Sequence, residues 1–255
     1  MPAQSGKRTE SLSEMRIIAT IPTFNEAENI AELVRGLRER DVEVLVADDD
    51  SPDGTAKIVG EMSQNDPGIH LLLRKEKKGR GLAGAEAFSK ALEMKAERIV
   101  EMDADLSHRP EDLPGLLAAL DRGAQVVIGS RFVGKGRDAR PSVIRRFLTR
   151  FSTAYARCVL GVHVRDCNSG FRAFTRDAME IIEPGTLVSV GPSIVHEVLM
   201  RAHRRGLRIA EVPILFTDRT RGKSELSLGR LLGGFIQVLK IRRRARTGRL
   251  WRSDG

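Results

Sequence analysis

Apolar and polar residues alternate with two different periods along the chain from Met15 onward. Short apolar runs rich in β-branched residues predict strands, and stretches in which apolar residues recur every three or four positions predict helices. In the first half the predicted strands are Arg16–Ile21, Val42–Ala47, His70–Leu73, Arg98–Met102 and Gln125–Ile128. The predicted helices between them are Glu28–Arg38, Thr55–Ser63, Gly81–Lys95 and Pro110–Leu120. This alternation indicates an α/β fold in which helices cover a mostly parallel sheet.

The pattern changes after Arg131. A loop rich in Gly, Lys, Arg and Asp covers 134–141 and leads into a long predicted helix, Val143–Leu160. Further elements follow as short strands around Phe171–Phe174 and Leu207–Leu215, with a helix at Pro192–Arg205 between them. The second half therefore predicts longer helices and fewer strands than the first half.

We expect one domain, at 15–242, because no Ser/Pro linker and no internal repeat divides the chain. The stretch 1–14 mixes Gln, Ser, Lys, Arg and Glu without an apolar segment, which predicts a loose tail rather than a signal peptide. A basic tail is expected at 243–255. The two cysteines, Cys158 and Cys167, are too few for a disulfide framework and indicate reduced thiols in a cytoplasmic protein.

An apolar stripe at helical spacing lies close to the C-terminus. Its members are Leu228, Leu231, Leu232, Phe235, Val238 and Leu239. They predict an amphipathic helix, which could rest on an anionic membrane or pack on the protein's own core, because both uses have the same period. No uncharged apolar run approaches the roughly 20 residues of a spanning helix. We therefore expect peripheral contact with the inner face of a membrane, directly or through a separate membrane-anchoring protein, and no transmembrane segment in this chain.

The net charge of +9 belongs mainly to the C-terminus. Seven Lys and Arg residues lie between Lys240 and Gly255, against the single acid Asp254, and the rest of the chain is nearly balanced. Such a cluster fits a membrane surface or a solvated end. With nine Phe, one Tyr and one Trp, and no interleaving of basic and aromatic residues, nucleic acid is not the expected partner, although a basic nucleic-acid-associated protein remains a minor alternative.

Acidic residues follow the first two predicted strands. The first strand leads into Pro22-Thr23-Phe24-Asn25-Glu26 and the second into Asp48-Asp49-Asp50-Ser51-Pro52-Asp53-Gly54-Thr55. Within the second segment, the end at 53–55 is typical of a turn and a helix cap. Three consecutive acids predict a positively charged or hydrogen-bonding partner, because unscreened like charges repel. Since ligands of parallel sheets bind where strands end, these loops indicate a nucleotide site.

The most specific motif is Asp103-Ala104-Asp105, directly after the strand Arg98–Met102. In an extended segment alternate side chains share a side, so both carboxylates can hold one hard cation, Mg²⁺ or Mn²⁺. A cation that bridges the two phosphates of a nucleotide neutralises the charge of the departing group. An Asp-x-Asp pattern alone is common, and it gains weight here from the acidic loops at neighbouring strand ends.

Basic residues follow the last strand of the first half. Arg131 lies at the end of that strand, and Arg145 and Arg146 lie beyond the 134–141 loop. Guanidinium groups suit a phosphate ligand, although Arg146 fits a solvated helix face equally well. The segment Gly79–Gly84 opens a helix and could offer backbone N–H groups to phosphate, but it matches neither the Walker nor the dinucleotide pattern.

Together these segments resemble the family 2 glycosyltransferases, and specifically the polyprenyl-phosphate (dolichyl-phosphate) mannosyltransferases. The resemblance covers about Met15 to Lys240, in the expected order. The segments that carry it are Pro22–Glu26, Asp48–Thr55, Met102–His108, Gly129–Phe132, Asn168–Arg172 and Glu211–Pro213.

The resemblance implies a GT-A, Rossmann-like fold, a nucleotide-sugar donor such as GDP-mannose, and transfer with inversion to a polyprenyl phosphate. The donor-binding residues that it implies are Pro22, Phe24, Glu26, Ala47, Asp49, Asp103, Ala104, Asp105 and Arg219. Those implied for the acceptor phosphate are Arg131, Arg145 and Thr149, and those implied for catalysis are Asp103, Asp105 and Arg131. The implied metal ligands are Asp103, Asp105 and Ser107.

Three positions depart from the family pattern. Phe24 stands where a tyrosine is usual, and Ser107 stands where some members have glutamine, so the third metal ligand stays open. Glu225 replaces a lysine that would face phosphate, with Arg221 or Lys223 as possible compensation. An inactive scaffold and a related transferase that uses UDP-glucose or another donor are therefore alternatives.

Overall fold

The computed structural model describes residues 15–76, 78–218 and 228–248. The predicted tail at 1–14, the last part of the basic tail at 249–255, and the positions Arg219, Arg221, Lys223 and Glu225 lie outside the described residues. Within the described residues, no helix combines the length and the apolar composition needed to cross a membrane.

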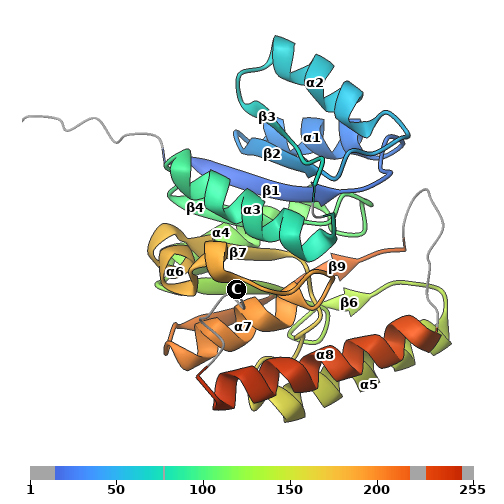
Figure 1. The fold of residues 1–255 in the computed structure, drawn as a ribbon, viewed down its shortest axis with the longest axis vertical. Coiled ribbons are helices and arrows are strands. Elements are labelled where there is room, and N and C mark those ends of the chain that lie inside the picture. Colours follow the sequence, from blue (N-terminus) through green and yellow to red (C-terminus); the bar gives the residue numbers. More distant parts are fainter. Residues whose placement is uncertain (1–14, 77, 219–227, 249–255) are drawn as a thin grey trace, which may run out of the picture.

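A seven-stranded sheet forms the centre of the molecule (Figure 1). Its strands are β1 (Ile17–Thr23), β2 (Glu43–Asp48), β3 (Ile69–Leu73), β4 (Arg98–Glu101), β5 (Val126–Ser130), β7 (Arg172–Thr175) and β8 (Ile209–Pro213), in the order β3-β2-β1-β4-β7-β5-β8. All neighbouring pairs are parallel except those of β7, which runs antiparallel to both β4 and β5. The predicted mostly parallel sheet is thus confirmed.

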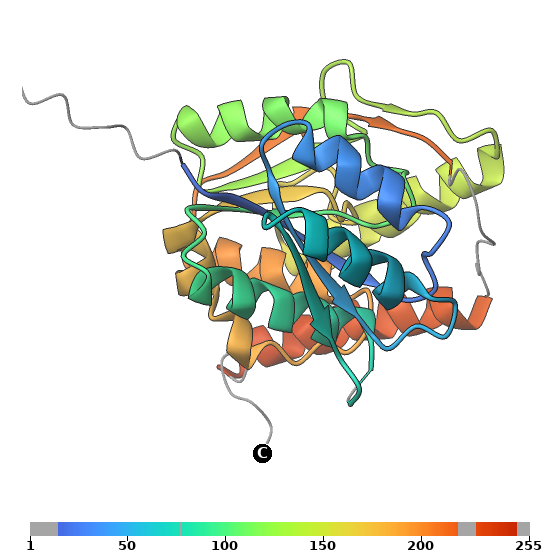
Figure 2. The same ribbon diagram turned by 90° about the horizontal axis from the view of Figure 1, so that it is seen from above.

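Helices cover both faces of this sheet. In chain order they are α1 (Ile30–Arg38), α2 (Thr55–Asn65), α3 (Arg80–Glu93), α4 (Leu113–Asp121), α5 (Val143–Leu160), α6 (Arg176–Ile182), α7 (Ile194–Arg204) and α8 (Leu228–Arg246), with short 3-10 helices at η1 (Pro110–Asp112) and η2 (Pro184–Thr186). Figure 2 shows α4 on one side of the sheet and α8 on the other. The bounds predicted for α5 match the structure, and Ser142 caps this helix by accepting a hydrogen bond from the N–H of Arg145.

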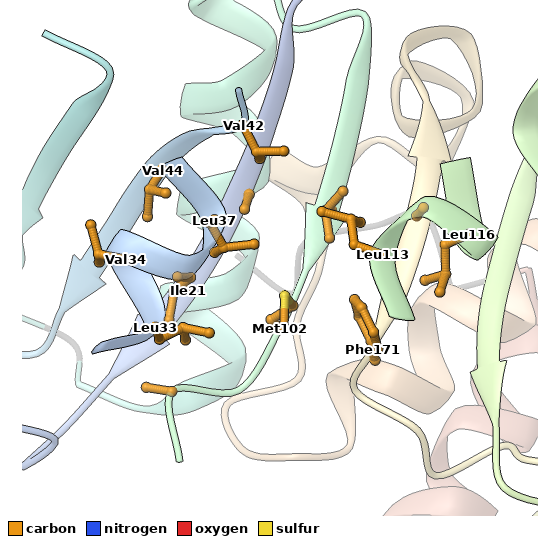
Figure 3. Packing of buried hydrophobic residues seen from close by; sticks show 14 of the residues in the cluster. Ile21, Leu33, Val34, Leu37, Val42, Val44, Met102, Leu113, Leu116 and Phe171 are labelled. Atoms are coloured by element: carbon orange, nitrogen blue, oxygen red, sulfur yellow. The ribbon is translucent and has the colours of Figure 1, made fainter. Parts of the chain in front are cut away.

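Apolar side chains on alternate positions of the strands form a core on each face. On one face, Ile21 of β1 packs with α1 and α4, and Figure 3 shows Leu33 and Leu37 directed toward the sheet beside Met102 and Phe171. On the other face, Ile18 of the same strand packs with α3, α6 and α7. This division follows from the two-residue period of β1, whose side chains are buried on both sides.

Two long helices, α5 and α8, lie side by side beyond α7 (Figure 1). Val238, Ile241 and Ala245 of α8 are buried in a third cluster together with Leu160 of α5. The predicted C-terminal stripe is therefore wrong as a single face, because Val238 packs in the core whereas Leu232 and Leu239 are exposed. The stripe side chains of Leu228 and Leu231 lie outside the described residues.

Three further predictions differ from the structure. The predicted helix Pro110–Leu120 is divided into η1 and α4, because Pro110 and Pro114 each lack a backbone N–H to donate. The predicted strand Leu207–Leu215 is interrupted at Ile214 between β8 and β9 (Leu215–Phe216). In the 134–141 loop, β6 (Arg137–Asp138) pairs with β9 in a small second sheet that the sequence pattern did not indicate.

Candidate active site

The acidic segments meet at one edge of the sheet. Strand β1 lies between β2 and β4 and is parallel to both, so all three carboxyl ends point the same way. The loops that follow, with Glu26, Asp49 and Asp103, are therefore neighbours, as expected for a ligand site of a parallel sheet. Hydrogen bonds from backbone N–H groups join the first two loops directly, from Asn25 to Ser51 Oγ at 3.0 Å, from Glu26 to Thr55 Oγ1 at 3.0 Å and from Ala27 to Asp53 Oδ2 at 2.9 Å.

The three consecutive acids of the second loop each have a partner within the protein. Asp49 is buried and accepts hydrogen bonds from the Arg74 guanidinium and, at 2.6 Å, from the N–H of Gly79. Asp48 accepts from the hydroxyls of Thr23 and Ser51 at 2.9 and 2.7 Å. Asp50 Oδ2 lies 3.4 Å from Lys78 Nζ. The predicted positive partners of this acidic run thus exist within the protein, as Arg74 and Lys78.

The end of the same loop forms the turn and helix start that the sequence predicts. Asp53 Oδ1 accepts from the N–H and the hydroxyl of Thr55 at 3.0 and 2.6 Å, and Gly54 adopts a left-handed φ of 92°. Burial opposes ionisation of Asp53, but the hydrogen bonds from Thr55 and from the N–H of Ala27 outweigh it and lower the pKa of this carboxyl. A left-handed conformation of this kind favours glycine at position 54.

The predicted nucleoside-binding positions line the start of this edge. Pro22 and Ala47 are buried at the ends of β1 and β2, whereas the Phe24 ring is exposed. Glu26 accepts a hydrogen bond from the Asn29 amide at 2.9 Å. The strand ends thus bring Phe24, Glu26 and Asp49 to one rim, where an exposed ring is available for stacking on a base.

Asp103 lies directly beyond β4 and is held by Arg80, the first residue of α3. Arg80 Nη2 and Nε lie 2.6 and 3.1 Å from Asp103 Oδ1. The same guanidinium lies 3.4 Å from Oε1 of Glu101, whose Oε2 has no hydrogen-bond partner among the described residues. Burial lowers the pKa of Arg80, but Asp103 and then Glu101 outweigh it and raise the pKa, whereas burial raises the pKa of Glu101. The Arg80 guanidinium therefore already binds one oxygen of Asp103, the carboxylate that is predicted to bind a metal.

The second oxygen of Asp103 faces Gly170. A Cβ at position 170 would lie 2.8 Å from Asp103 Oδ2 and 3.1 Å from Arg80 Nη2. Contacts this short would require Asp103 or Arg80 to shift. Glycine at position 170 thus allows the backbone to approach this oxygen closely.

Asp105 and Ser107 form a tight local turn. Asp105 Oδ1 accepts from the N–H and the hydroxyl of Ser107 at 3.1 and 2.6 Å, with Leu106 at a φ of 59° between them. His108 is buried against Phe171 and Phe216, and its Nδ1 lies 3.9 Å from Asp103 Oδ2. Burial lowers the pKa of His108 and keeps its ring neutral.

These residues fit a hard divalent cation in donor chemistry. Asp103 and Asp105 supply carboxylate oxygens, which Mg²⁺ and Mn²⁺ prefer, and the Asp103 side chain is 35% exposed. In the described part of the chain, no group of three His, Cys, Asp or Glu residues converges on one point. The protein would therefore hold a metal with two carboxylates, and the role of Ser107 as a third ligand stays a prediction.

A cavity of about 800 Å³ opens from Asp103 and Arg80 toward α8. The loop 188–193, which precedes α7, lines one side, and Lys240 and Arg244 of α8 line another. On its wall Asn168 donates to Ser152 Oγ and Thr153 Oγ1 at 2.8 and 3.0 Å. A cavity of this size beside the acidic loops can hold a sugar ring.

His196 forms part of the same wall and is neutral. Its Nε2 lies 2.8 Å from Asn168 Oδ1, and its Nδ1 has no hydrogen-bond partner in the described residues. Burial, followed by the nearby charge of Arg172, lowers the pKa of His196 to about 3. This imidazole therefore orients Asn168 as a neutral donor.

The residues predicted for the acceptor phosphate meet around Phe216. Arg131 is buried and lies over one side of the Phe216 ring at 4.8 Å, and Arg140 lies 5.1 Å from the same ring. Arg140 donates to Thr149 at 2.8 Å. One turn earlier on α5, Arg145 Nη1 lies 3.5 Å from Asp218 Oδ1. The structure thus brings Arg131 and Thr149 into one network and places Arg145 at its border.

The Arg131 guanidinium is itself tied to a buried acid. Its Nε and Nη2 donate to Asp166 at 2.7 Å each, and the Arg131 N–H donates to the same carboxylate at 3.0 Å. A bidentate pair of this kind fixes the plane of the guanidinium. Arg219 belongs to the predicted donor set but lies outside the described residues.

Reasoning from the sequence missed four partners of the predicted residues. Arg74 and Arg80 hold Asp49 and Asp103, Asp166 holds Arg131, and His196 holds Asn168. Arg80 lies inside the Gly79–Gly84 segment, which had been considered only for its backbone N–H groups. Its side chain could have been predicted as a partner of Asp103, because a cation at the start of a helix near an acidic strand end is a candidate for an ion pair.

The chain is similar to glycosyltransferases over most of its length. Residues 19–182 match the model of glycosyl transferase family 2. The undecaprenyl-phosphate mannosyltransferase of Micrococcus luteus is 39% identical over 217 residues, which cover 84% of this chain and 89% of the relative. The polyprenol monophosphomannose synthase of Mycolicibacterium smegmatis is 36% identical over 237 residues, which cover 92% of this chain and 89% of the relative.

A solved structure shares the fold at lower identity. It is the glucosyl-3-phosphoglycerate synthase from Mycobacterium tuberculosis in complex with Mn²⁺, uridine diphosphate and glucosyl-3-phosphoglycerate. It aligns with a TM-score of 0.64 and 22% identity, over 92% of this chain and 81% of that one. The architecture is thus that of the GT-A enzymes.

Proposed function

The chain belongs to glycosyltransferase family 2, and from this we propose that it transfers mannose from GDP-mannose to a polyprenyl phosphate. The observation that carries the proposal is the similarity to two polyprenyl-phosphate mannosyltransferases over 89% of the length of each. The three acidic loops at one sheet edge and the cavity beside Asp103 support it.

For donor binding, we propose that the nucleoside lies on the rim formed by Phe24, Glu26 and Asp49. The diphosphate would reach Asp103 and Asp105, which are of the right chemistry to hold Mg²⁺ or Mn²⁺. When bound, the metal would neutralise the negative charge that develops on the leaving nucleoside diphosphate. If the metal binds Asp103 through Oδ1, Arg80 would move from that oxygen, and its cation would then be available to the diphosphate.

The transfer is a direct displacement with inversion. An acceptor phosphate oxygen forms the new bond to the anomeric carbon while the bond from that carbon to the diphosphate breaks. The acceptor is anionic at neutral pH, so no strong general base is needed and positioning is the main task. Arg131, oriented by Asp166, and Arg145 with Thr149 would hold the acceptor phosphate in line with the sugar.

We further infer that the protein works as a peripheral enzyme on the inner face of a membrane. The polyprenyl acceptor is a membrane lipid, and the exposed Leu232 and Leu239 on α8 precede a run of arginines. A separate membrane-anchoring partner would serve the same purpose.

Product analysis tests the whole proposal. The purified protein is incubated with GDP-mannose, a polyprenyl phosphate and either Mg²⁺ or Mn²⁺, and the lipid products are identified by mass spectrometry. A mannosyl phosphate lipid is expected, and its formation should stop when the metal is removed with a chelator. Transfer from UDP-glucose but not from GDP-mannose would overturn the donor assignment.

A further inference from the structure

A second cavity, of about 440 Å³, lies beside α5 away from the acidic loops and is lined by four arginines. Arg150 and Arg157 come from α5, Arg165 comes from the segment after it, and Arg131 lies at the end of β5. Phe132 and Ala154 add apolar wall, and Arg150 lies over the Phe132 ring at 5.7 Å. We call this cavity the arginine pocket.

The charges of the arginine pocket are unbalanced. Arg131 is neutralised by Asp166, but Arg150, Arg157 and Arg165 make no ion pair with any described residue. Glu211 accepts hydrogen bonds from the backbone N–H groups of Arg165 and Asp166 and makes no ion pair with the Arg165 side chain. Three like charges around one cavity repel each other unless an anion joins them. Guanidinium groups that converge from different elements suit a phosphate group.

An exposed apolar surface adjoins this pocket. We call it the apolar strip, and its members are Val143, Ile144, Phe147 and Phe151 of α5 with Leu232, Ile236 and Leu239 of α8. The two helices lie side by side (Figure 1), and the rings of Phe151 and Tyr155 on α5 pack edge-on against Phe235 on α8. Large contiguous apolar surfaces of this kind mark contacts with membranes or partners.

The strip and the pocket occupy neighbouring faces of the same helix. Phe147 lies three residues before Arg150, and Phe151 lies three residues before Ala154, so each pair is adjacent on the surface of α5. A surface that binds the apolar strip would therefore also contact the opening of the arginine pocket. Apolar chains beside phosphate groups are the arrangement that a phospholipid bilayer presents.

We propose that Arg150, Arg157 and Arg165 of the arginine pocket bind the phosphate group of an anionic phospholipid in a bilayer that also receives the apolar strip, while Arg131, held by Asp166, serves the acceptor. The proposal rests on the proposed function only in that a polyprenyl phosphate acceptor is itself a lipid. The pocket would hold a lipid that is not consumed, and so would fix the tilt of the enzyme while the acceptor reaches the active site.

Vesicle binding tests the pocket. The variant in which Arg150, Arg157 and Arg165 are changed to Gln is compared with a matched control in which Lys57, Lys95 and Arg122 are changed to Gln. The control removes the same charge from exposed positions on other elements. With phosphatidylcholine vesicles that contain phosphatidylglycerol, we expect the pocket variant to bind about tenfold more weakly than the wild type and the control to change less than about twofold. Equal losses in both variants, or none in the pocket variant, would overturn the proposal.

A second set of variants tests the apolar strip. Ile144→Ser with Phe147→Ser should weaken binding to vesicles with and without phosphatidylglycerol, because the strip contributes apolar contact rather than charge. Unchanged binding of this variant would contradict the assignment of the surface. Calorimetric titration of the wild type with inorganic phosphate separates the sources of the anion, since saturation of the pocket by phosphate without vesicles would indicate a site for a free anion and reject the lipid.

The proposed function is tested separately with a short, water-soluble polyprenyl phosphate in the absence of vesicles. The pocket variant should transfer mannose to it as fast as the wild type does, because none of the three substituted arginines belongs to the proposed active site. A reduced rate would show that these arginines serve catalysis instead and would overturn the lipid role. If the wild type does not transfer mannose, the proposed function is wrong. The vesicle experiment would still show whether the arginine pocket binds an anionic phospholipid.

Discussion

The acidic sheet edge and the helix pair α5–α8 differ in whether their charged side chains have partners of opposite charge. At the sheet edge the acids have partners within the protein: Arg74 holds Asp49, and Arg80 holds Asp103. Beside α5, the arginines Arg150, Arg157 and Arg165 lack acidic partners among the described residues, and apolar side chains stay exposed. At the sheet edge the charges are balanced, so a bound ligand would replace an arginine of the protein as the partner of an acid. Beside α5 the positive charges are unbalanced, so a bound anion would neutralise them.

The largest expected effect is at the acidic edge. Asp105→Ala should lower the rate of mannose transfer by about 10³-fold or more, because it removes one of the two carboxylates that we propose hold the charge-neutralising metal. The rate is measured with GDP-mannose and polyprenyl phosphate at saturating Mn²⁺, and the melting temperature checks the fold. Asp121→Asn, at an exposed acid paired with Arg98, is the control and should leave the rate unchanged. A folded Asp105→Ala protein with normal turnover would remove the metal site.

The next effect concerns the buried pair that orients the acceptor arginine. Asp166→Asn leaves the Arg131 guanidinium buried beside a neutral amide, which should lower the free energy of unfolding by about 3 kcal/mol. Urea denaturation measures this loss. The exposed pair Lys57–Glu61 is the control, and Glu61→Gln should have a small effect. If Asp166→Asn lowers the free energy of unfolding no more than Glu61→Gln does, the ion pair with Asp166 does not hold Arg131 in place.

A smaller effect is expected from the internal cation at Asp103. Arg80→Gln removes the group that competes with metal for this carboxylate, so the affinity for Mn²⁺ without donor should rise about tenfold, or about 1.4 kcal/mol. Titration followed by electron paramagnetic resonance of free Mn²⁺ measures it. Arg80→Lys keeps the charge and should stay close to the wild type. Weaker Mn²⁺ binding by Arg80→Gln would show that Arg80 supports the site rather than competing for it.

The smallest effect is a pH dependence of stability from His196. The folded pKa is lowered to about 3, from an ordinary value of 6.5, so between these values the unfolded state binds the proton and the folded state does not. The contribution of neutral His196 to the free energy of unfolding is present above pH 6.5 and is lost as the pH falls toward 3. Between pH 7.5 and 5.5 the free energy of unfolding should fall by about 1 kcal/mol more in the wild type than in His196→Gln.

The control for this prediction is His163→Gln, at an exposed histidine. It should keep the pH dependence of the wild type in the same urea titrations. Identical curves for wild type and His196→Gln would contradict a neutral buried imidazole at this position.

Local pattern predicted most of the elements but not their directions. The strand bounds of the first half agree to within about two residues, because β-branched runs and intervening helix periods are local properties. The short run at Arg172–Thr175 predicted a strand, but nothing local distinguishes an antiparallel strand between β4 and β5 from a parallel one at an edge. The two-residue pairing of β6 with β9 is likewise too short to give a period.

For the site, the sequence indicated which residues carry the chemistry but not what holds them. The acidic loops converge as predicted because β1 lies between β2 and β4. The ion pair of Arg131 with Asp166 joins positions 35 residues apart, and that of Arg80 with Asp103 joins positions 23 apart. Such pairs depend on tertiary packing and leave no periodic trace in the sequence. Metal binding by Asp103, Asp105 and Ser107 and phosphate binding by Arg131, Arg145 and Thr149 remain predictions.

The antiparallel strand β7 has a consequence for how the molecule assembles. It lies between β4 and β5, although the chain makes both of those strands before it reaches Arg172. During synthesis β4 therefore lacks its second neighbour, and β5 lacks its neighbours, until 172–175 emerges from the ribosome and joins them through contacts distant in sequence, which form slowly. The proposed donor side at β4 and the proposed acceptor side at β5 come together only in that step. A truncated nascent chain that ends before β7 would leave one edge of β4 and both edges of β5 unpaired, and open strand edges favour aggregation.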